Sequence, residues 1–143
     1  MGLAPVEISL KLIDDKVKFE GISKSSPNHP IVFDYVPPLG TGDGFVGIEM
    51  MTMSFAGCVS TAIVALLKRR GKTVSAYEMQ IQGIKHEEPL YLEEIVFTAT
   101  VDGSEMTQEE LDEVLALSEK ISPAWIAIRG NVKVSGAIQR RSV

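Results

Sequence analysis

The stretch from Ile48 to Gly71 restricts the fold more than any other feature of the chain, because it predicts one long and largely apolar helix. Its apolar side chains recur at helical spacing, namely Ile48, Met51, Phe55, Ala62, Ile63, Leu66 and Leu67. Gly71 follows the last apolar turn and is well placed to end the helix in a left-handed conformation. Few charges lie between Glu49 and Lys68, so both faces of the helix need cover. We expect a sheet of the same chain on one face and a second subunit on the other.

Apolar and polar residues alternate on both sides of this helix, which predicts strands. Residues 8–12 and 17–19 alternate around the polar turn 14–16 and predict an antiparallel hairpin. Further strands are expected at residues 31–35, 77–81, 95–101 and 132–134, the second and third of them joined by the polar link 85–89 as another antiparallel pair.

The remaining segments predict loops and one more helix. Residues 37–47 contain two prolines and four glycines and are expected to form a loop. Thr107-Gln-Glu-Glu is a capping box that begins a second helix. The buried face of that helix is expected to consist of Leu111, Val114, Leu115 and Leu117. After Ser122-Pro123 the chain is expected to loop through Trp125 and Gly130.

The order of these elements predicts the fold class. Strands, a long helix, strands, a helix and a strand follow one another without a repeated strand-helix unit. This order favours an α+β fold with antiparallel sheets around a long central helix. With 143 residues, the chain is expected to form a single domain over residues 1–143.

Charge and composition argue against several function classes. The net charge of −5 argues against nucleic-acid binding, and the basic residues 68–72 fall at the end of the predicted long helix, where cations are favoured. Arg140-Arg141 is expected to be a solvated tail. The longest apolar stretch, Ile63 to Leu67, is far shorter than the ~20 residues that cross a bilayer. No membrane contact is therefore expected, and the N-terminus predicts a cytoplasmic protein because it lacks the pattern of a signal peptide.

Cys58 is the only cysteine of the chain and the first candidate for chemistry. It lies among small residues from Ser54 to Ala62, where a substrate can approach a thiol, and it has no partner for an intramolecular disulfide. The alternative is a buried cysteine that acts as a small, inert apolar residue. His29 and His86 have no acid or cysteine at ligand spacing, so no metal and no cofactor are expected.

Two segments resemble a known family. Ala56-Gly57-Cys58 with the following residues 66–72, and residues 110–123 ending in Ser122-Pro123, resemble the OsmC/Ohr family of thiol-dependent organic hydroperoxide reductases. The resemblance extends over residues 45 to 135. It implies an intertwined homodimer in which the long helices pack at the interface and the active sites lie between the subunits.

The resemblance also implies a chemistry, in which a reactive thiolate reduces an organic peroxide, becomes a sulfenic acid and is captured by a second cysteine. Cys58 matches the reactive position. Ser122 matches the resolving position, and its hydroxyl cannot form a disulfide. The family carboxylate falls on Ile48, and the neighbouring Glu49 is turned by about 100° on a helix. Glu49 therefore ranks below Cys58 as a catalytic candidate, and an acidic residue that complements the helix N-terminus is the alternative.

The family arginine has no counterpart, because it comes from the N-terminal region and the first arginine of this chain is Arg69. Lys24 or His29 is the only substitute considered, and neither offers the rigid bidentate fork of a guanidinium. Met51, Phe55 and Trp125 are candidates for the wall of a pocket near Cys58, with core packing as the alternative.

The residues leave two functions open. The first is a single-cysteine organic hydroperoxide reductase, in which an external thiol regenerates Cys58. The second is a non-catalytic protein that binds a small hydrophobic or acyl ligand in the cavity between two subunits.

Overall fold

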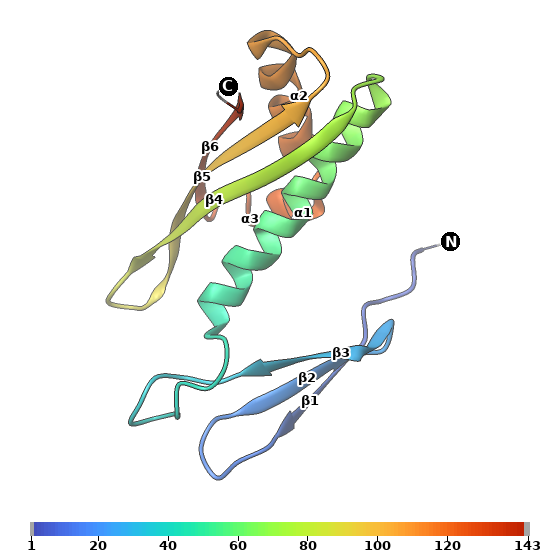
Figure 1. Ribbon diagram of the computed structural model, residues 1–143. Helices are drawn as coiled ribbons and strands as arrows, with labels where there is room; N and C mark the ends of the chain where they lie inside the picture. Colours follow the sequence, from blue (N-terminus) through green and yellow to red (C-terminus); the bar gives the residue numbers. More distant parts are fainter. Residues whose placement is uncertain (1, 142–143) are drawn as a thin grey trace. The chain divides into compact units, whose positions relative to one another are not determined.

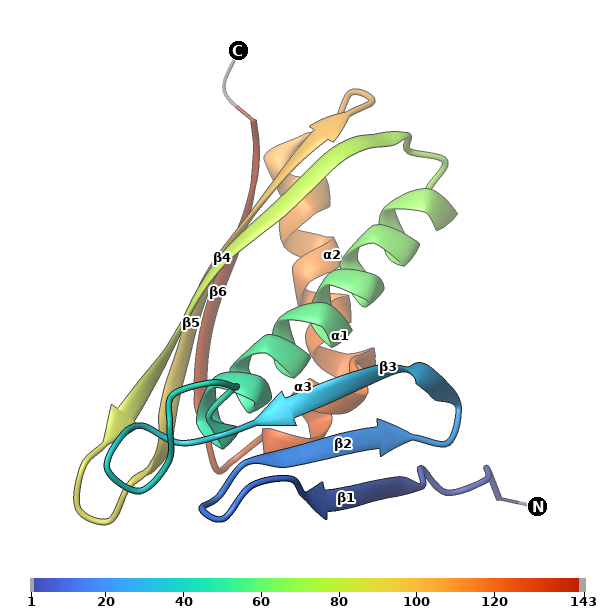
Figure 2. The ribbon, with the colours of Figure 1, turned by 60° about the horizontal axis from the view of Figure 1, so that its bottom comes forward.

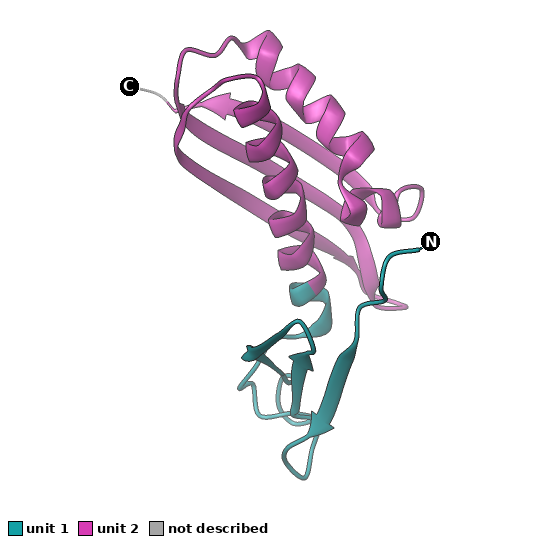
Figure 3. Cartoon of the chain, turned by 90° about the vertical axis from the view of Figure 1, so that its right-hand side faces the viewer, with its two compact units in different colours: residues 1–50 teal, residues 51–143 magenta. Residues whose placement is uncertain are grey.

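The computed structural model describes residues 2–141 and divides the chain into two compact units, residues 1–50 and residues 51–143 (Figure 3). The elements follow one another as three strands, a long helix, two strands, two helices and a last strand (Figure 1). The prediction of a single domain over residues 1–143 stays a prediction.

The first unit contains a three-stranded antiparallel sheet. Its strands are β1 (Ile8–Leu12), β2 (Phe19–Ser23) and β3 (Ser26–Phe33), in the order β1-β2-β3. In the turn between β1 and β2, the Asp14 carboxylate accepts hydrogen bonds from the amides of Lys16 and Lys18, at 2.9 and 3.0 Å. The predicted hairpin is therefore confirmed, while the third strand begins at residue 26 rather than 31.

The long helix, α1 (Gly47–Arg69), begins in the first unit and runs through the second. Its buried residues are Phe55, Val59, Ile63 and Leu67, one for each turn. The helix ends as predicted. Gly71 has a φ of 76°, its amide bonds to the Lys68 carbonyl, and the Lys72 amide bonds to the Leu67 carbonyl. These two bonds are the Schellman pattern that a glycine in the left-handed conformation permits.

By length and composition alone, α1 is apolar enough to cross a membrane, a property that it shares with the core helices of soluble proteins. Its buried residues lie four apart and therefore on one face. The exposed residues of the second-unit part include serine, glycine and threonine, namely Ser54, Gly57 and Thr61. A single buried apolar stripe with small and polar residues on the opposite side is typical of a core helix, and α1 is a helix of this type.

The second unit contains a mixed sheet. β4 (Val74–His86) and β5 (Tyr91–Gly103) are antiparallel, as predicted, and β6 (Lys133–Arg140) lies beside β5. The expectation of antiparallel sheets is wrong for this last pair, because β6 runs parallel to β5, with Ala99 opposite Ile138. The reason is the connection. A tight turn reverses the chain, whereas the helical crossover between Gly103 and Lys133 returns it to the starting end of β5.

β6 also extends beyond the predicted residues 132–134 and includes Arg140. Arg140 is therefore part of a strand rather than of a tail. Its guanidinium lies 3.7 Å from the Glu105 carboxylate.

α2 (Gln108–Ile121) begins with the predicted capping box. The Glu110 amide donates to the Thr107 hydroxyl at 3.1 Å, and the Thr107 amide donates to the Glu110 carboxylate at 2.8 Å. The buried side chains are Leu111, Val114 and Ser118. Leu117, which was expected on the buried face, is exposed, because the 3.6-residue period brings Ser118 to that face instead.

A short helix, α3 (Pro123–Ile128), replaces the loop expected after Ser122. Pro123 occupies the first turn, where its missing amide hydrogen costs nothing. Trp125 therefore lies on a helix and is buried.

Within the second unit, α1 and α2 lie on the same face of the β4-β5-β6 sheet (Figure 2). The core between these layers contains the buried stripe of α1 and the side chains of β5 that point to the same face, Ile95, Phe97, Ala99 and Val101. Gly136 of β6 lies against the Phe97 ring, where any β-carbon would overlap the ring. The predicted α+β class is therefore confirmed, with α1 packed on one face of the sheet of the second unit.

Candidate functional site

Cys58 and Ser122 meet in the second unit. Cys58 lies on α1, about three turns after the start of the helix, and is half-buried. Ser122 directly follows α2 and is fully buried. The Ser122 hydroxyl donates a hydrogen bond to the Cys58 sulfur over 3.4 Å. Cys58 is therefore not fully enclosed, and its sulfur faces a buried hydroxyl.

The backbone of Ser122 is fixed by both neighbouring helices. Its amide donates to the Ser118 carbonyl at 2.9 Å, and its carbonyl accepts from the Ile126 amide at 3.0 Å. Ser122 is the N-cap residue of α3, where a serine hydroxyl usually accepts a hydrogen bond from an amide of the first turn. No such side-chain bond is present here. The hydroxyl is directed at Cys58 instead.

Tyr77 of β4 helps to hold α1 against the sheet. Its hydroxyl donates to the Ser60 hydroxyl at 2.8 Å, two residues after Cys58 in the chain. Burial raises the pKa of the Tyr77 hydroxyl, so this donor keeps its proton at neutral pH. The contact therefore fixes the helix that carries the thiol.

Phe55 and Trp125, two of the predicted pocket residues, belong to an aromatic cluster together with Phe97. The ring centroids of Phe55 and Trp125 are 5.6 Å apart, and those of Phe97 and Trp125 are 5.8 Å apart in an edge-on arrangement. All three side chains are buried. Met51, the third predicted residue, is 52% exposed. The aromatic pair packs in the core, and the pocket role of the three residues stays a prediction.

Phe97 is the member of this cluster that the sequence analysis placed only in a strand. The alternation of β5 predicts that Phe97 shares a face with Ile95 and Ala99, which is a signal for the core. It gives no information on which helix covers that face.

Glu49 lies in the first turn of α1 and is exposed. Its carboxylate accepts a hydrogen bond from the Val46 amide at 3.4 Å. This contact satisfies one of the free amides before the helix and is the usual role of an acid in a first turn. A catalytic role for Glu49 stays a prediction.

The cations considered as substitutes for the family arginine have other surroundings. Lys24 pairs with Glu7 at 2.8 Å in the first unit, and His29 is exposed on β3. In the second unit, Arg69 lies in the last turn of α1 and Arg70 pairs with Glu113 at 2.8 Å. None of these contacts places one of these cations beside the Cys58 sulfur.

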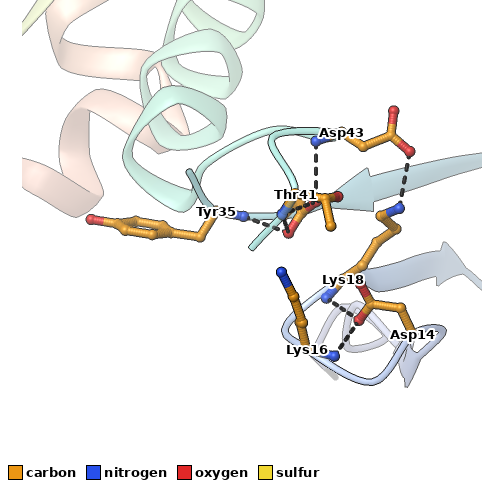
Figure 4. A network of polar contacts seen from close by, with 7 residues as sticks. Asp14, Lys16, Lys18, Tyr35, Thr41 and Asp43 are labelled. Carbon is orange, nitrogen blue, oxygen red and sulfur yellow. Dashed lines mark hydrogen bonds and ion pairs between the residues drawn. The ribbon is translucent and has the colours of Figure 1, made fainter. Parts of the chain in front are cut away.

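A second polar site, which the sequence analysis missed, lies in the first unit around the buried Asp34 carboxylate. This carboxylate accepts hydrogen bonds from the Thr41 hydroxyl at 2.6 Å, the Tyr35 amide at 2.7 Å and the Asp43 amide at 3.1 Å. Figure 4 shows three residues of this network, Tyr35, Thr41 and Asp43. The Thr41 hydroxyl and these amides hold the pKa of Asp34 well below its usual range, against the opposing effect of burial. The network organises the loop that leads into α1.

Asp43 of the same loop pairs with Lys18 of the hairpin at 3.0 Å. The hydrogen bond that the Lys18 ammonium donates to the Asp43 carboxylate raises the pKa of Lys18. A signal for this network exists in the sequence, because aspartate side chains often bond the amides of a following turn and the loop is rich in proline and glycine. The partner residues, however, cannot be chosen from spacing alone.

Within residues 2–141, no group of three or more His, Cys, Asp or Glu side chains is arranged to hold a metal ion. The site described above presents a thiol beside a hydroxyl donor.

Comparisons with known proteins agree with the resemblance. The model of the family described as OsmC-like protein matches residues 40–136. No curated protein matches the sequence.

Solved structures share the fold over nearly the whole chain. An OsmC-like protein of unknown function from Vibrio cholerae has a TM-score of 0.84 and 12% identity, over 95% of this chain and 99% of that one. An organic hydroperoxide resistance protein OsmC from Legionella pneumophila has a TM-score of 0.77 and 16% identity, over 97% and 99%. The organic hydroperoxide resistance protein OhrB of Bacillus subtilis has a TM-score of 0.63 and 17% identity, over 96% and 99%. At these identities the likeness establishes the fold.

Proposed function

Because the chain belongs to the family of OsmC-like proteins, we propose that it is a thiol-dependent reductase of organic hydroperoxides with Cys58 as its reacting residue. The observation that carries this proposal is the half-buried Cys58 thiol with a buried hydroxyl donor 3.4 Å away. A reacting thiol needs access for the substrate, and Cys58 is only half-buried and faces a hydroxyl donor. Structural neighbours named as organic hydroperoxide resistance proteins support the reaction class.

In the proposed reaction, the Cys58 thiolate attacks one oxygen of the hydroperoxide. A sulfur–oxygen bond forms, the oxygen–oxygen bond breaks, and the alkoxide that leaves takes a proton from water to become an alcohol. The sulfur loses two electrons and becomes a sulfenic acid, while the peroxide is reduced by the same two electrons.

Regeneration requires an external thiol, because Cys58 is the only cysteine of the chain. One thiol attacks the sulfenic acid, releases water and forms a mixed disulfide with Cys58. A second thiol attacks that disulfide, so that Cys58 returns to the thiol and the two external thiols leave as a disulfide. Two reducing equivalents therefore balance each peroxide.

The proposed assembly is an intertwined homodimer. In the second unit, one face of α1 is exposed along its length, and its residues are Met51, Ser54, Gly57, Thr61 and Ala65. In the first unit, Ile8, Leu10 and Leu12 alternate along β1 and are 60%, 58% and 49% exposed. The exposed apolar row of β1 is typical of a surface that another protein covers, and the small residues of the α1 face let a second helix approach closely. A second copy of the chain supplies the same surfaces in return. A cytoplasmic location, where small thiols stay reduced, fits the proposed cycle.

The experiment that tests the proposal follows the consumption of cumene hydroperoxide in the presence of dithiothreitol, for the purified protein and for Cys58→Ser. We expect turnover for the protein and none for the variant, with the sulfenic acid trapped on Cys58 and detected by intact mass. Equal turnover of the two proteins, or trapping no faster than that of free cysteine, would refute the proposed activity.

A second candidate function is the binding of a small hydrophobic or acyl ligand without catalysis. Exposed methionines at the start of the second unit favour it, since Met51 and Met53 are 52% and 49% exposed and methionine surfaces adapt to varied apolar ligands. Native mass spectrometry and thermal shift with a panel of fatty acids test this function. An empty protein that no fatty acid stabilises would argue against it.

A further inference from the structure

We propose that Ser122 activates Cys58 by donating its hydroxyl hydrogen bond to the sulfur in the thiolate state. This inference rests on the proposed function and adds a residue to it. Ser122 touches the atom that reacts, since its hydroxyl oxygen lies 3.4 Å from the Cys58 sulfur. The position that a resolving cysteine occupies in the family thus has a different task in this chain, which is to stabilise the thiolate rather than to form a disulfide.

The first argument is that the Ser122 hydroxyl does not cap the helix that follows it. A serine at the N-cap of a helix typically accepts a hydrogen bond from an amide of the first turn. Ser122 occupies the N-cap of α3 and forms no such bond. Its backbone amide and carbonyl are bound by α2 and α3, so two helices fix the position of the residue and the direction in which its side chain leaves the backbone. The hydroxyl is thereby aimed at the sulfur.

The second argument is burial. Ser122 is fully buried, and a buried hydroxyl without a partner loses the hydrogen bonds that water would give it. A neutral thiol is a weak acceptor, whereas a thiolate is a charged and much stronger one. The Ser122 bond therefore gains most strength when Cys58 is ionised. A hydrogen bond that favours the charged form of a group makes ionisation easier.

Ser122 keeps its proton throughout the reaction. The proton that Cys58 releases goes to water, and the alkoxide formed from the peroxide is protonated from water. The serine hydroxyl remains a donor, first to the thiolate and then to the oxidised sulfur. It is neither a general base nor a nucleophile, so no bond to Ser122 forms or breaks.

The test is the pH dependence of alkylation by iodoacetamide between pH 5 and 10, followed by intact mass. The single cysteine makes this readout specific for Cys58. For Ser122→Ala we expect the pH midpoint of the alkylation rate to rise by about one unit, because a charge-assisted hydrogen bond is lost. A more basic thiolate is also a better nucleophile, by about threefold for each unit. The variant should thus react about threefold more slowly at low pH and about threefold faster on the high-pH plateau.

Ser118→Ala is the matched control. Ser118 is fully buried on α2, four residues before Ser122, and its hydroxyl donates to the Val114 carbonyl at 2.8 Å. Its removal should leave the midpoint unchanged. Ser122→Thr, which keeps a hydroxyl, should return the midpoint to that of the natural sequence. If circular dichroism shows that Ser122→Ala does not fold, Ser122→Gly removes the same hydroxyl and the same rise is expected.

The outcomes separate the two proposals. A midpoint that does not move in Ser122→Ala or Ser122→Gly, or that moves equally in Ser118→Ala, overturns the role of Ser122 while the peroxide assay still supports the activity. Trapping of sulfenic acid no faster than on free cysteine overturns the proposed activity, whatever the alkylation profile. A crossing pair of pH profiles, slower at low pH and faster at high pH, supports the role of Ser122, because a purely structural change would move the rate in the same direction at every pH.

Discussion

The Ser122 hydroxyl lies 3.4 Å from the Cys58 sulfur, although 64 positions separate the two residues in the chain. α2 and α3 meet at Ser122, and α1 carries Cys58, so three helices determine this distance. A serine at this point preserves the approach of the two side chains and removes the ability to form a disulfide. The Cys58–Ser122 pair therefore differs from a pair of cysteines by a single atom, the Ser122 oxygen in place of a sulfur.

Ser122→Cys tests this geometry directly. We expect the variant to form an intramolecular disulfide with Cys58 after treatment with a stoichiometric amount of peroxide, because two sulfur atoms can bond after a small side-chain movement from contact distance. The intact mass should fall by about 2 Da relative to the reduced variant, one hydrogen for each cysteine that is joined. Ser118→Cys is the control, since the Ser118 hydroxyl points to the Val114 carbonyl, and it should yield no such loss. Free thiols in oxidised Ser122→Cys would show that the contact is not maintained in solution.

The close approach of Gly136 to Phe97 gives a prediction about stability. A β-carbon at position 136 would overlap the Phe97 ring, which is buried against Trp125. We expect Gly136→Ala to lower the free energy of unfolding by roughly 1–3 kcal/mol, the usual cost of overpacking a core. Urea unfolding followed by tryptophan fluorescence measures it, since Trp125 is the only tryptophan. Gly2→Ala, whose β-carbon meets nothing within 4 Å, should be neutral, and an equally neutral Gly136→Ala would contradict the packing described here.

The sequence predicts those parts of the fold that depend on local patterns. α1 and its glycine stop follow from helical spacing and from one left-handed residue, and the capping box at Thr107 places the start of α2. The hairpins follow from alternation around short polar turns. The residues that determine each of these features lie within about ten positions of one another, so a short window of sequence is enough to predict it.

The features that the sequence does not predict depend on contacts between distant segments. The parallel pairing of β6 with β5 requires knowledge of where α2 and α3 return the chain. The Asp34 network requires the partner Thr41 to be selected from a loop of similar residues. At the candidate site, the pairing of Cys58 with Ser122 was indicated by the family resemblance and not by spacing, because α-helical periodicity places no constraint on residues of two different helices.

Asp34 gives a prediction about pH. Its carboxyl has a lower pKa in the folded chain than in the unfolded chain, where the value is about 3.9. The ionised form therefore stabilises the fold fully above the unfolded value, and this contribution is lost as the pH falls through the lower folded value. We expect Asp34→Asn to lower the melting temperature by several degrees at pH 7, with a difference from the natural sequence that becomes smaller below about pH 4.

Asp15→Asn is the control for this experiment, because Asp15 is an exposed aspartate of the β1–β2 turn in the same unit. Its melting temperature should follow that of the natural sequence at every pH. A difference for Asp34→Asn that stays constant from pH 7 to pH 3 would mean that the lost stability does not come from the ionised carboxylate.

The exposed face of α1 gives the prediction about assembly. Gly57 lies on that face, one residue before Cys58, and a β-carbon there would meet nothing within 4 Å in the single chain. If a second copy packs on this face, a large side chain must separate the two helices, because small residues allow close approach. We expect Gly57→Trp to be monomeric in light scattering while its circular dichroism remains that of the natural protein, which should be a dimer. In a monomer with this face in water, Gly57→Ala would be stabilising by roughly 0.5–1 kcal/mol through helix propensity alone. A dimer that persists in Gly57→Trp would place the interface elsewhere on the chain, and a natural protein that is itself monomeric would refute the proposed assembly.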